Sequence, residues 1–393
     1  MLAFLCATGS ASAEKRSCVQ AIRTGKASGS PLVPSYCKAQ FYSMQARREE
    51  AILLEHIEEL PPFSRLLCTC PGRAQFALAA ARRFPEAAVH CQYLDLFEAA
   101  QAVQECEPLP GNLIIDCQAD FPAEAVQLAV IPTSQSAQAE LARERLQEAY
   151  LRLDDGGTLL ASVDNPQDSW LLQQLETLFG KVQRQENGDA ILYRGVKSGP
   201  LRRVRNFECE FAFRHHDRLF KLVSRPGVFS HRRLDLGARK LLNALDAEPG
   251  ETVLELGCGT GAVSLAAAAT PGVQVLAVDS NARAIDCVLR SARLNSLEHI
   301  QTEVSATGPT GLAGQPSDFS LILGNPPYYA NFQIAETFLQ IANRVIHPQG
   351  RLILVSKFPD WYADNARRYF RGVQIEQAGD YWIIRCTGAH RAI

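Results

Sequence analysis

The sequence has little of what would place a chain in a membrane or around a metal ion. No apolar run approaches the roughly 18 residues that a membrane-spanning helix needs. Its twelve cysteines are scattered, and no Cys-x-x-Cys pair occurs, so the usual zinc and thioredoxin spacings are missing. Single cysteines are typical of reduced thiols that serve as small hydrophobic side chains. We therefore expect a reduced, cytoplasmic protein without membrane contact or metal, acting as a monomer.

Methionine is also scarce, since only Met1 and Met44 occur. Residues 14–43 are rich in Ser, Lys, Arg and Gly and show no hydrophobic periodicity. Residues 1–13 have no basic start, and their apolar stretch is too short for a signal peptide. Helical patterning begins directly after Met44. We therefore expect residues 1–43 to be a disordered extension of the folded protein.

The rest of the chain contains an internal repeat. Residues 179–194 align without gaps with residues 370–385, sharing Phe, Val, Gln, Gly, Asp and Arg at an offset of 191. The apolar runs 156–163 and 349–356 match at an offset of 193. A repeat on this scale indicates two copies of one fold. We predict two tandem domains, over residues 44–197 and 198–393.

Each copy alternates short apolar runs with helical patterns, which is typical of parallel α/β domains. In the second copy we predict strands at 253–256, 273–279, 319–324 and 350–356. Helical patterns cover residues 262–269 and 335–346. The predicted fold class is therefore α/β, with two Rossmann-like domains in tandem.

A basic connector, at about residues 200–225, joins the copies. Residues 207–224 alternate polar and apolar side chains around a turn at 215–217, which predicts a β-hairpin. Residues 194–240 hold thirteen Lys and Arg against four Asp and Glu, although the whole chain has a net charge of −2. We expect the connector to bind RNA phosphates, with a solvated charged surface as the alternative. The candidate side chains are Arg202, Arg203, Arg205, Arg214, Arg218 and Lys221.

A glycine-rich turn follows the first predicted strand of the second copy. Its sequence is Glu255-Leu256-Gly257-Cys258-Gly259-Thr260-Gly261. Glycines let the backbone approach a ligand closely, and the following helix N-terminus attracts negative charge. A dinucleotide site would use GxGxxG here, whereas GxGxG after an acidic residue favours S-adenosylmethionine (SAM). The loop amides would bind its carboxylate and Glu255 its amino group; a tight turn without ligand is the alternative.

An acidic residue, Asp279, ends the second predicted strand of this copy. An acid at this position can accept hydrogen bonds from both ribose hydroxyls of a nucleotide. A simple helix N-cap is the alternative. Because the glycine-rich turn precedes it, we predict that Asp279 binds the ribose of the cofactor.

The run Asn325-Pro326-Pro327-Tyr328 follows the strand predicted at 319–324. Two prolines fix the backbone and leave carbonyls without competing N–H groups. The Asn325 side-chain oxygen and the Pro326 carbonyl can accept both hydrogens of an NH2 group and orient its lone pair. Tyr328 can stack on a planar base. The run therefore predicts a methyltransferase whose acceptor is an exocyclic amine.

Residues 225–388 resemble the bacterial ribosomal RNA small-subunit guanine-N2 methyltransferase family and its large-subunit relatives. The likeness rests on residues 226–230 (PGVFS), Leu234-Asp235, Gly237, the glycine-rich turn, Asp279 and the NPPY run. The resemblance implies class I SAM-dependent methyltransferase domains, of which the first is degenerate, and adds Asp235 to the cofactor site. Family members commonly have Phe at the position of Tyr328.

The first copy lacks the residues of this chemistry. Cys70, Gly72 and Ala74 stand where the second copy has its three glycines. Residues 132–134 (PTS) replace the Asn-Pro-Pro run, and only Asp95 lies near the position of Asp279. We therefore predict that the first copy binds no SAM.

Together these features predict methyl transfer from SAM to guanine N2 of ribosomal RNA, free or in a ribosomal subunit, without a side-chain base. An adenine-N6 or a protein glutamine-amide methyltransferase remains an alternative, because both use NPPY. A non-catalytic RNA-binding assembly factor is the alternative from another class.

Overall fold

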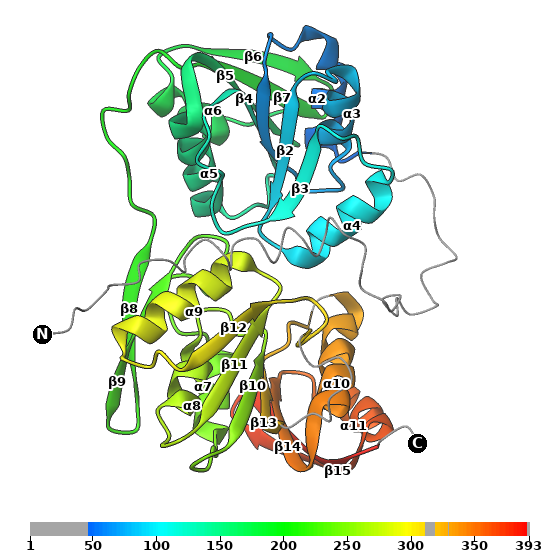
Figure 1. The fold of residues 1–393 in the computed structure, drawn as a ribbon, viewed down its shortest axis with the longest axis vertical. Helices are drawn as coiled ribbons and strands as arrows, with labels where there is room; N and C mark the ends of the chain where they lie inside the picture. Colours follow the sequence, from blue (N-terminus) through cyan, green and yellow to red (C-terminus); the bar gives the residue numbers. More distant parts are fainter. Residues whose placement is uncertain (1–45, 311–318, 329, 391–393) are drawn as a thin grey trace, which may run out of the picture. The chain divides into compact units, whose positions relative to one another are not determined.

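A computed structural model describes residues 46–310, 319–328 and 330–390. The extension predicted over residues 1–43 lies outside them. From Arg47 onward the described residues belong to one compact unit. This unit contains two seven-stranded sheets and one two-stranded sheet (Figure 1).

The N-terminal half of the described residues, 46–197, carries the first sheet, with strand order β3-β2-β1-β4-β5-β7-β6. Strands β1 to β5 pair in parallel, and β7 runs antiparallel to both of its neighbours. The strands are β1 (Arg65–Thr69), β2 (Ala88–Tyr93), β3 (Leu113–Cys117), β4 (Val126–Thr133), β5 (Leu153–Val163), β6 (Val182–Asn187) and β7 (Ala190–Val196).

The C-terminal half, from residue 198 to the last described residue, 390, carries a second sheet with the equivalent order β12-β11-β10-β13-β14-β16-β15. Its strands are β10 (Thr252–Leu256), β11 (Gln274–Asp279), β12 (Ile300–Val304), β13 (Phe319–Gly324), β14 (Ile346–Ser356), β15 (Phe370–Ala378) and β16 (Tyr381–Ala389). The repeat found in the sequence therefore corresponds to a repeated topology. The predicted strand at 319–324 coincides with β13, and the others overlap β10, β11 and β14.

Helices cover both faces of each sheet (Figure 1). In the N-terminal half, α2, α3 and α4 pack on one face, and α5 and α6 on the other. In the C-terminal half, α7, α8 and α9 share one core with the sheet, and α10 and α11 share the other. Apolar strands buried on both faces are expected for a largely parallel sheet.

The helix bounds are as follows. The N-terminal half contains α2 (Arg48–Glu55), η2 (Ile57–Glu59), α3 (Gln75–Arg83), α4 (Leu96–Cys106), α5 (Ala139–Arg152) and α6 (Trp170–Leu178). The C-terminal half contains α7 (Leu236–Ala244), α8 (Ala262–Ala268), α9 (Ala282–Leu294), η3 (Ala330–Phe332), α10 (Gln333–Val345), α11 (Pro359–Asn365) and η4 (Ala366–Arg368). None of the described helices is long and apolar enough to cross a membrane.

The predicted hairpin is present as β8 (Cys209–His215) and β9 (Arg218–Ser224). Phe213 and Phe220 stack with their ring centroids 5.2 Å apart and belong to the core beneath α7, α8 and α9. The hairpin is therefore packed on the C-terminal half. Its Arg218 donates to the backbone carbonyl of Asn295, at 2.9 Å, at the end of α9.

The two halves are joined by a buried network of charges. The Arg283 side chain, in the first turn of α9, is fully buried and pairs with Glu144 and Glu148 of α5. It also donates to the carbonyls of Ala119 and Pro226, both at 2.8 Å. All of these partners lie outside α9, and Ala119, Glu144 and Glu148 belong to the N-terminal half. The network therefore fixes α9 against the N-terminal half.

A second contact between the halves involves the backbone. The N–H of Leu96 donates to the carbonyl of Ser280, and the N–H of Ala282 donates to that of Leu94, each at 2.8 Å. The Ser280 hydroxyl donates to the carboxylate of Asp95 at 2.6 Å. Asp95, which lies near the position equivalent to Asp279 in the sequence of the N-terminal half, therefore supports the segment directly after Asp279.

Candidate active site

Three loops of the C-terminal half meet at one edge of its sheet. Strand β10 pairs in parallel with β11 and β13, so that Leu256 lies beside Val278 and Gly324. The glycine-rich turn, Asp279 and Asn325 therefore follow neighbouring strand ends. The carboxyl edge of a parallel sheet, where strand order reverses, is where ligands bind in such folds.

Each glycine of the turn has a left-handed backbone, with φ of 66° at Gly257, 54° at Gly259 and 82° at Gly261. Side chains at two of them would collide with the protein, because a Cβ would lie 3.0 Å from Phe338 at Gly257 and 2.8 Å from Val288 at Gly261. A Cβ at Gly259 would meet no described atom within 4 Å. Gly259 therefore faces open space, as a backbone that receives a ligand must.

The turn is held in place by β11. The backbone amides of Gly257 and Cys258 both donate to the carbonyl of Val278, at 2.8 and 3.1 Å. The Cys258 side chain is buried in the core, and this burial raises the pKa of its thiol well above the usual value. Cys258 therefore contributes backbone and packing rather than a reactive thiolate.

Asp279 is tied to the same turn. Its carboxylate accepts the N–H of Gly259 at 2.8 Å and the N–H of Asn281 at 2.9 Å. Burial raises the pKa of Asp279 to about 6, although these hydrogen bonds act in the opposite direction. The side chain that we predicted to bind a ribose thus lies directly against the open glycine.

Glu255 lies beneath the turn. Its side chain is 4% exposed, and one carboxyl oxygen accepts the hydroxyl of Ser264 on α8. Burial raises the pKa of Glu255 to about 8. Ser264 was not among the residues that the sequence indicated, because nothing in its local pattern distinguishes it from other helix positions.

Asn325 is oriented by Asp235. The Asn325 Nδ2 atom donates to Oδ2 of Asp235 at 2.9 Å, and the same oxygen accepts the N–H of Ala238 at 2.9 Å, in the first turn of α7. Because a carboxylate only accepts, the amide nitrogen of Asn325 must face Asp235. Its Oδ1 atom then points away and can accept a hydrogen from a substrate.

Aromatic side chains surround the residue after the two prolines. Pro326 is buried, and Tyr328 is 51% exposed with its ring centroid 5.3 Å from that of Phe358. Phe358 also contacts Phe332, which stacks on Trp361 at 5.0 Å. The sequence indicated Tyr328 alone, because the other three rings come from segments beyond β13 and β14.

The corresponding turn of the N-terminal half is closed by its own side chains. The Cys70 Sγ atom accepts the N–H groups of Gly72 and Ala74, at 3.2 and 3.1 Å. The fully buried Glu50 of α2 accepts the N–H of Phe76 at 2.8 Å. Cys70 thus bonds two amides of this turn, and the carboxylate of Glu50 takes up an amide in the first turn of α3.

In the part of the chain that the structure describes, no group of three or more His, Cys, Asp or Glu side chains is arranged to bind a metal ion. Nine cysteines of this part are free thiols.

The strand order, the glycine-rich turn and the acid that ends β11 define tandem Rossmann-like domains of the class I methyltransferase type, and the predicted fold class is confirmed. Residues 219–385 match the family described as "Methyltransferase small domain". The match begins at the second residue of the hairpin strand β9 and includes the strands of the second sheet up to the middle of β16.

Curated relatives carry two related names. "Ribosomal RNA small subunit methyltransferase C" of Pseudoalteromonas atlantica is 32% identical over 160 residues, which are 39% of this chain and 45% of the relative. The protein of the same name in Aeromonas hydrophila is 34% identical over 186 residues, which are 44% of this chain and 52% of the relative. "Ribosomal RNA large subunit methyltransferase G" of Psychromonas ingrahamii is 30% identical over 175 residues, which are 42% of this chain and 45% of the relative. The chain thus spans about half the length of these relatives, and the predicted resemblance is confirmed.

Among solved structures, the chain is similar to the T. thermophilus 16S rRNA N2 methyltransferase RsmC, solved in complex with AdoMet and guanosine. The TM-score is 0.71 at 21% identity, and the match covers 87% of this chain and 92% of that one. The likeness therefore includes both halves and supports the tandem fold.

Proposed function

We propose that this protein transfers a methyl group from SAM to guanine N2 of ribosomal RNA. The observation that carries the proposal is the hydrogen bond of 2.9 Å from Asn325 to Asp235, which leaves the Asn325 Oδ1 atom facing away from Asp235 beside the open glycine-rich turn. The names of the curated relatives support ribosomal RNA as the substrate class.

The residues at the turn fit SAM. Gly259 has a positive φ and free space where a side chain would be, so its backbone can approach a ligand. Asp279 lies within hydrogen-bonding distance of the same backbone and can exchange its contacts for ribose hydroxyls. When bound, SAM supplies a methyl group activated by its sulfonium. Gly257, Cys258, Gly261 and Glu255 shape and support the turn.

The acceptor side is formed by the NPPY run. Asn325 Oδ1 and the Pro326 carbonyl would accept the two hydrogens of the exocyclic amine, while exposed Tyr328 and its neighbour Phe358 stack on the base. The nitrogen then forms its bond to the methyl carbon as the carbon–sulfur bond breaks. The alkylated nitrogen is strongly acidic and loses its proton to water, so no side-chain base is needed.

The contacts of Asp235 support another role than the one that the resemblance implied. Its carboxylate contacts Asn325 and caps α7, so we propose that it positions the acceptor residue rather than the cofactor. Fixing the amide orientation in advance reduces the reorganisation needed in the transition state.

The N-terminal half would hold RNA and stabilise its twin without binding SAM. Its turn is closed by Cys70 and Glu50, and α5 supplies partners for buried Arg283. We propose that the protein acts as a monomer in the cytoplasm on ribosomal RNA or a ribosomal subunit.

Mass spectrometry of ribosomal RNA nucleosides from a strain lacking the gene tests this proposal. We expect one N2-methylguanosine to be lost and to return with the wild-type gene but not with Asn325→Ala. Loss of N6-methyladenosine, or loss of a methylated glutamine in a parallel mass spectrum of the cellular proteins, would instead support one of the other two methyltransferase classes. Unchanged modification together with no SAM binding by calorimetry would favour a non-catalytic assembly factor.

A further inference from the structure

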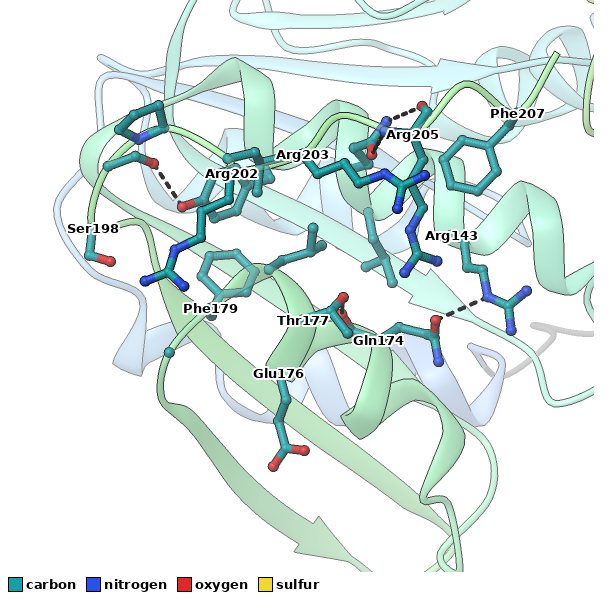
Figure 2. Close-up of a pocket in the computed structure, with 18 residues that line it drawn as sticks. Arg143, Gln174, Glu176, Thr177, Phe179, Ser198, Arg202, Arg203, Arg205 and Phe207 are labelled. Atoms are coloured by element: carbon teal, nitrogen blue, oxygen red, sulfur yellow. Dashed lines mark hydrogen bonds between the residues drawn. The ribbon is translucent and has the colours of Figure 1, made fainter.

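A cavity of about 600 Å³ lies on the N-terminal half, between α5, α6 and residues 198–207 of the connector (Figure 2). It is within the size range of ligand sites in proteins. Its apolar floor includes Tyr150 and Phe179, which are 3% and 2% exposed. The floor offers no open aromatic face, so a ligand would be recognised at the rim.

The connector is bound to α5 along this cavity. The Tyr150 hydroxyl donates to the carbonyl of Gly199 at 2.8 Å. The Gln147 side chain bonds both backbone groups of Arg205, donating to its carbonyl at 2.9 Å and accepting its N–H at 2.8 Å. These contacts hold the intervening residues in place, so the rim is already ordered before any ligand arrives.

Four arginines surround the opening. Arg202, Arg203 and Arg205 reach it from the connector, and Arg143 reaches it from α5 (Figure 2). None of the four forms an ion pair with a carboxylate of the described residues, and Arg143 instead bonds the neutral side chain of Gln174 at 3.0 Å. The one acid in the lining is Glu176, which is exposed and points away from the arginines in Figure 2. The lining therefore holds four arginines against one carboxylate and carries net positive charge.

The repeat distinguishes Arg143 from its counterpart in the C-terminal half. Strands β4 and β13 begin 193 residues apart, and so do strands β5 and β14. Position 143 of the first copy therefore corresponds to Glu336 of α10 in the second. There Glu336 accepts hydrogen bonds from Arg368 at 3.2 Å and from Tyr369 at 2.9 Å. The catalytic copy thus closes this face with an ion pair, whereas the degenerate copy presents a guanidinium that pairs with no described carboxylate.

We propose that this cavity binds the sugar-phosphate backbone of the RNA substrate, away from the target nucleotide. The inference rests on the proposed function and adds a second RNA site in the N-terminal half. Guanidinium groups bind phosphate oxygens in a bidentate manner. With no open aromatic face in the floor, recognition is of phosphate rather than of base identity. The hairpin arginines Arg214 and Arg218 bond nearby carbonyls instead, at 3.3 and 2.9 Å.

The test compares the full-length variant Arg143→Gln/Arg202→Gln/Arg203→Gln with the control Arg82→Gln/Arg367→Gln/Arg371→Gln, whose three exposed arginines lie outside the cavity. Binding of transcribed small-subunit ribosomal RNA is measured by fluorescence anisotropy at several salt concentrations. We expect the log–log salt slope of the cavity variant to flatten by about 2, at roughly 0.7–0.9 per lost phosphate contact. The control should keep the wild-type slope, and both should keep the wild-type SAM affinity.

Methyl transfer is measured in parallel, so that failure of this inference differs from failure of the proposed function. We expect the KM for RNA to rise in the cavity variant while kcat is retained. An unchanged slope in that variant, with normal wild-type methyl transfer, would overturn the cavity assignment alone. Wild-type protein that binds RNA but methylates none would overturn the proposed function, while the salt slopes would still show whether the cavity binds RNA.

If the triple variant does not fold, the double variant Arg202→Gln/Arg203→Gln, at two exposed positions, tests the cavity in the same way. If the cavity variant loses binding to polyglutamate but binds RNA as the wild type does, the cavity would instead be a binding site for an acidic protein.

Discussion

The Asn325 Nδ2 atom lies 2.9 Å from Oδ2 of Asp235, a residue 90 positions earlier in the chain. Asp235→Ser keeps an acceptor for capping α7 but removes the carboxylate oxygen that orients Asn325. We expect kcat to fall by about 10²-fold, because a misplaced positioning group can cost that much, while SAM affinity and melting temperature change little. The matched control is Asp168→Ser, which alters a carboxylate that bonds the first turn of α6. Equal kcat losses in both variants would remove Asp235 from its proposed role.

Gly237 gives a steric test of the same site. A Cβ at this position would lie 2.8 Å from Oδ1 and 2.9 Å from Nδ2 of Asn325. Gly237→Ala should displace the amide and lower kcat by about 10²-fold, with SAM affinity retained in calorimetry. The control is Gly111→Ala, where a Cβ would meet no described atom within 4 Å. Wild-type turnover in Gly237→Ala would show that the Asn325 amide has no fixed position.

Glu255 should make stability depend on pH. Burial raises its pKa from 4.5 to about 8 in the folded protein. Its contribution to stability is therefore fully present below pH 4.5 and is lost as the pH rises through about 8. The free energy of unfolding should fall by up to about 1.4 kcal/mol per pH unit in this window.

Urea unfolding of the SAM-free protein from pH 5 to pH 9 measures this effect. Glu255→Gln should flatten the pH dependence, whereas Glu298→Gln, at an exposed position, should leave it as in the wild type. Parallel curves for the wild type and Glu255→Gln would mean that the carboxyl group is ionised when the protein is folded.

Arg283 provides a test of how the halves depend on each other. Its side chain is fully buried and pairs with Glu144 and Glu148. Arg283→Met should lower the free energy of unfolding by about 3–5 kcal/mol, because it leaves the buried carboxylate of Glu144 without its partner, although Glu148 keeps Arg145. Arg290→Met, at a side chain 35% exposed with ion pairs to Glu208 and Asp286, should cost about 1 kcal/mol or less. Similar losses in the two variants, measured in denaturant, would contradict a stabilising interface.

Local patterns were sufficient to predict the repeat, the principal strands of the second sheet and the hairpin. Strand β13 was predicted with its observed bounds because an apolar run ended by Asn-Pro-Pro is a local signal. The three loops of the site were each recognised from their own residues, and the parallel pairing of their strands places them at one edge of the sheet. These inferences need only residues close in sequence and the rule that relates strand order to the ligand edge.

Contacts between distant residues could not be predicted in this way. Glu50 reaches the amide of Phe76 across 26 positions, and Arg283 reaches Glu144 across 139. Asp235 was assigned to the cofactor by resemblance, although it bonds Asn325. Neither periodicity nor spacing carries information about which buried side chain meets which, so these partners required the structure.

The most direct test of the account is a single-turnover measurement of methyl transfer from labelled SAM to small-subunit ribosomal RNA, for wild type and Asn325→Ala. SAM affinity is measured on the same preparations. We predict that the wild type forms N2-methylguanosine and that Asn325→Ala is slower by about 10²-fold or more, because an oriented acceptor contact is lost, with nearly unchanged SAM affinity. Near-normal transfer by Asn325→Ala would contradict the assignment of the acceptor site.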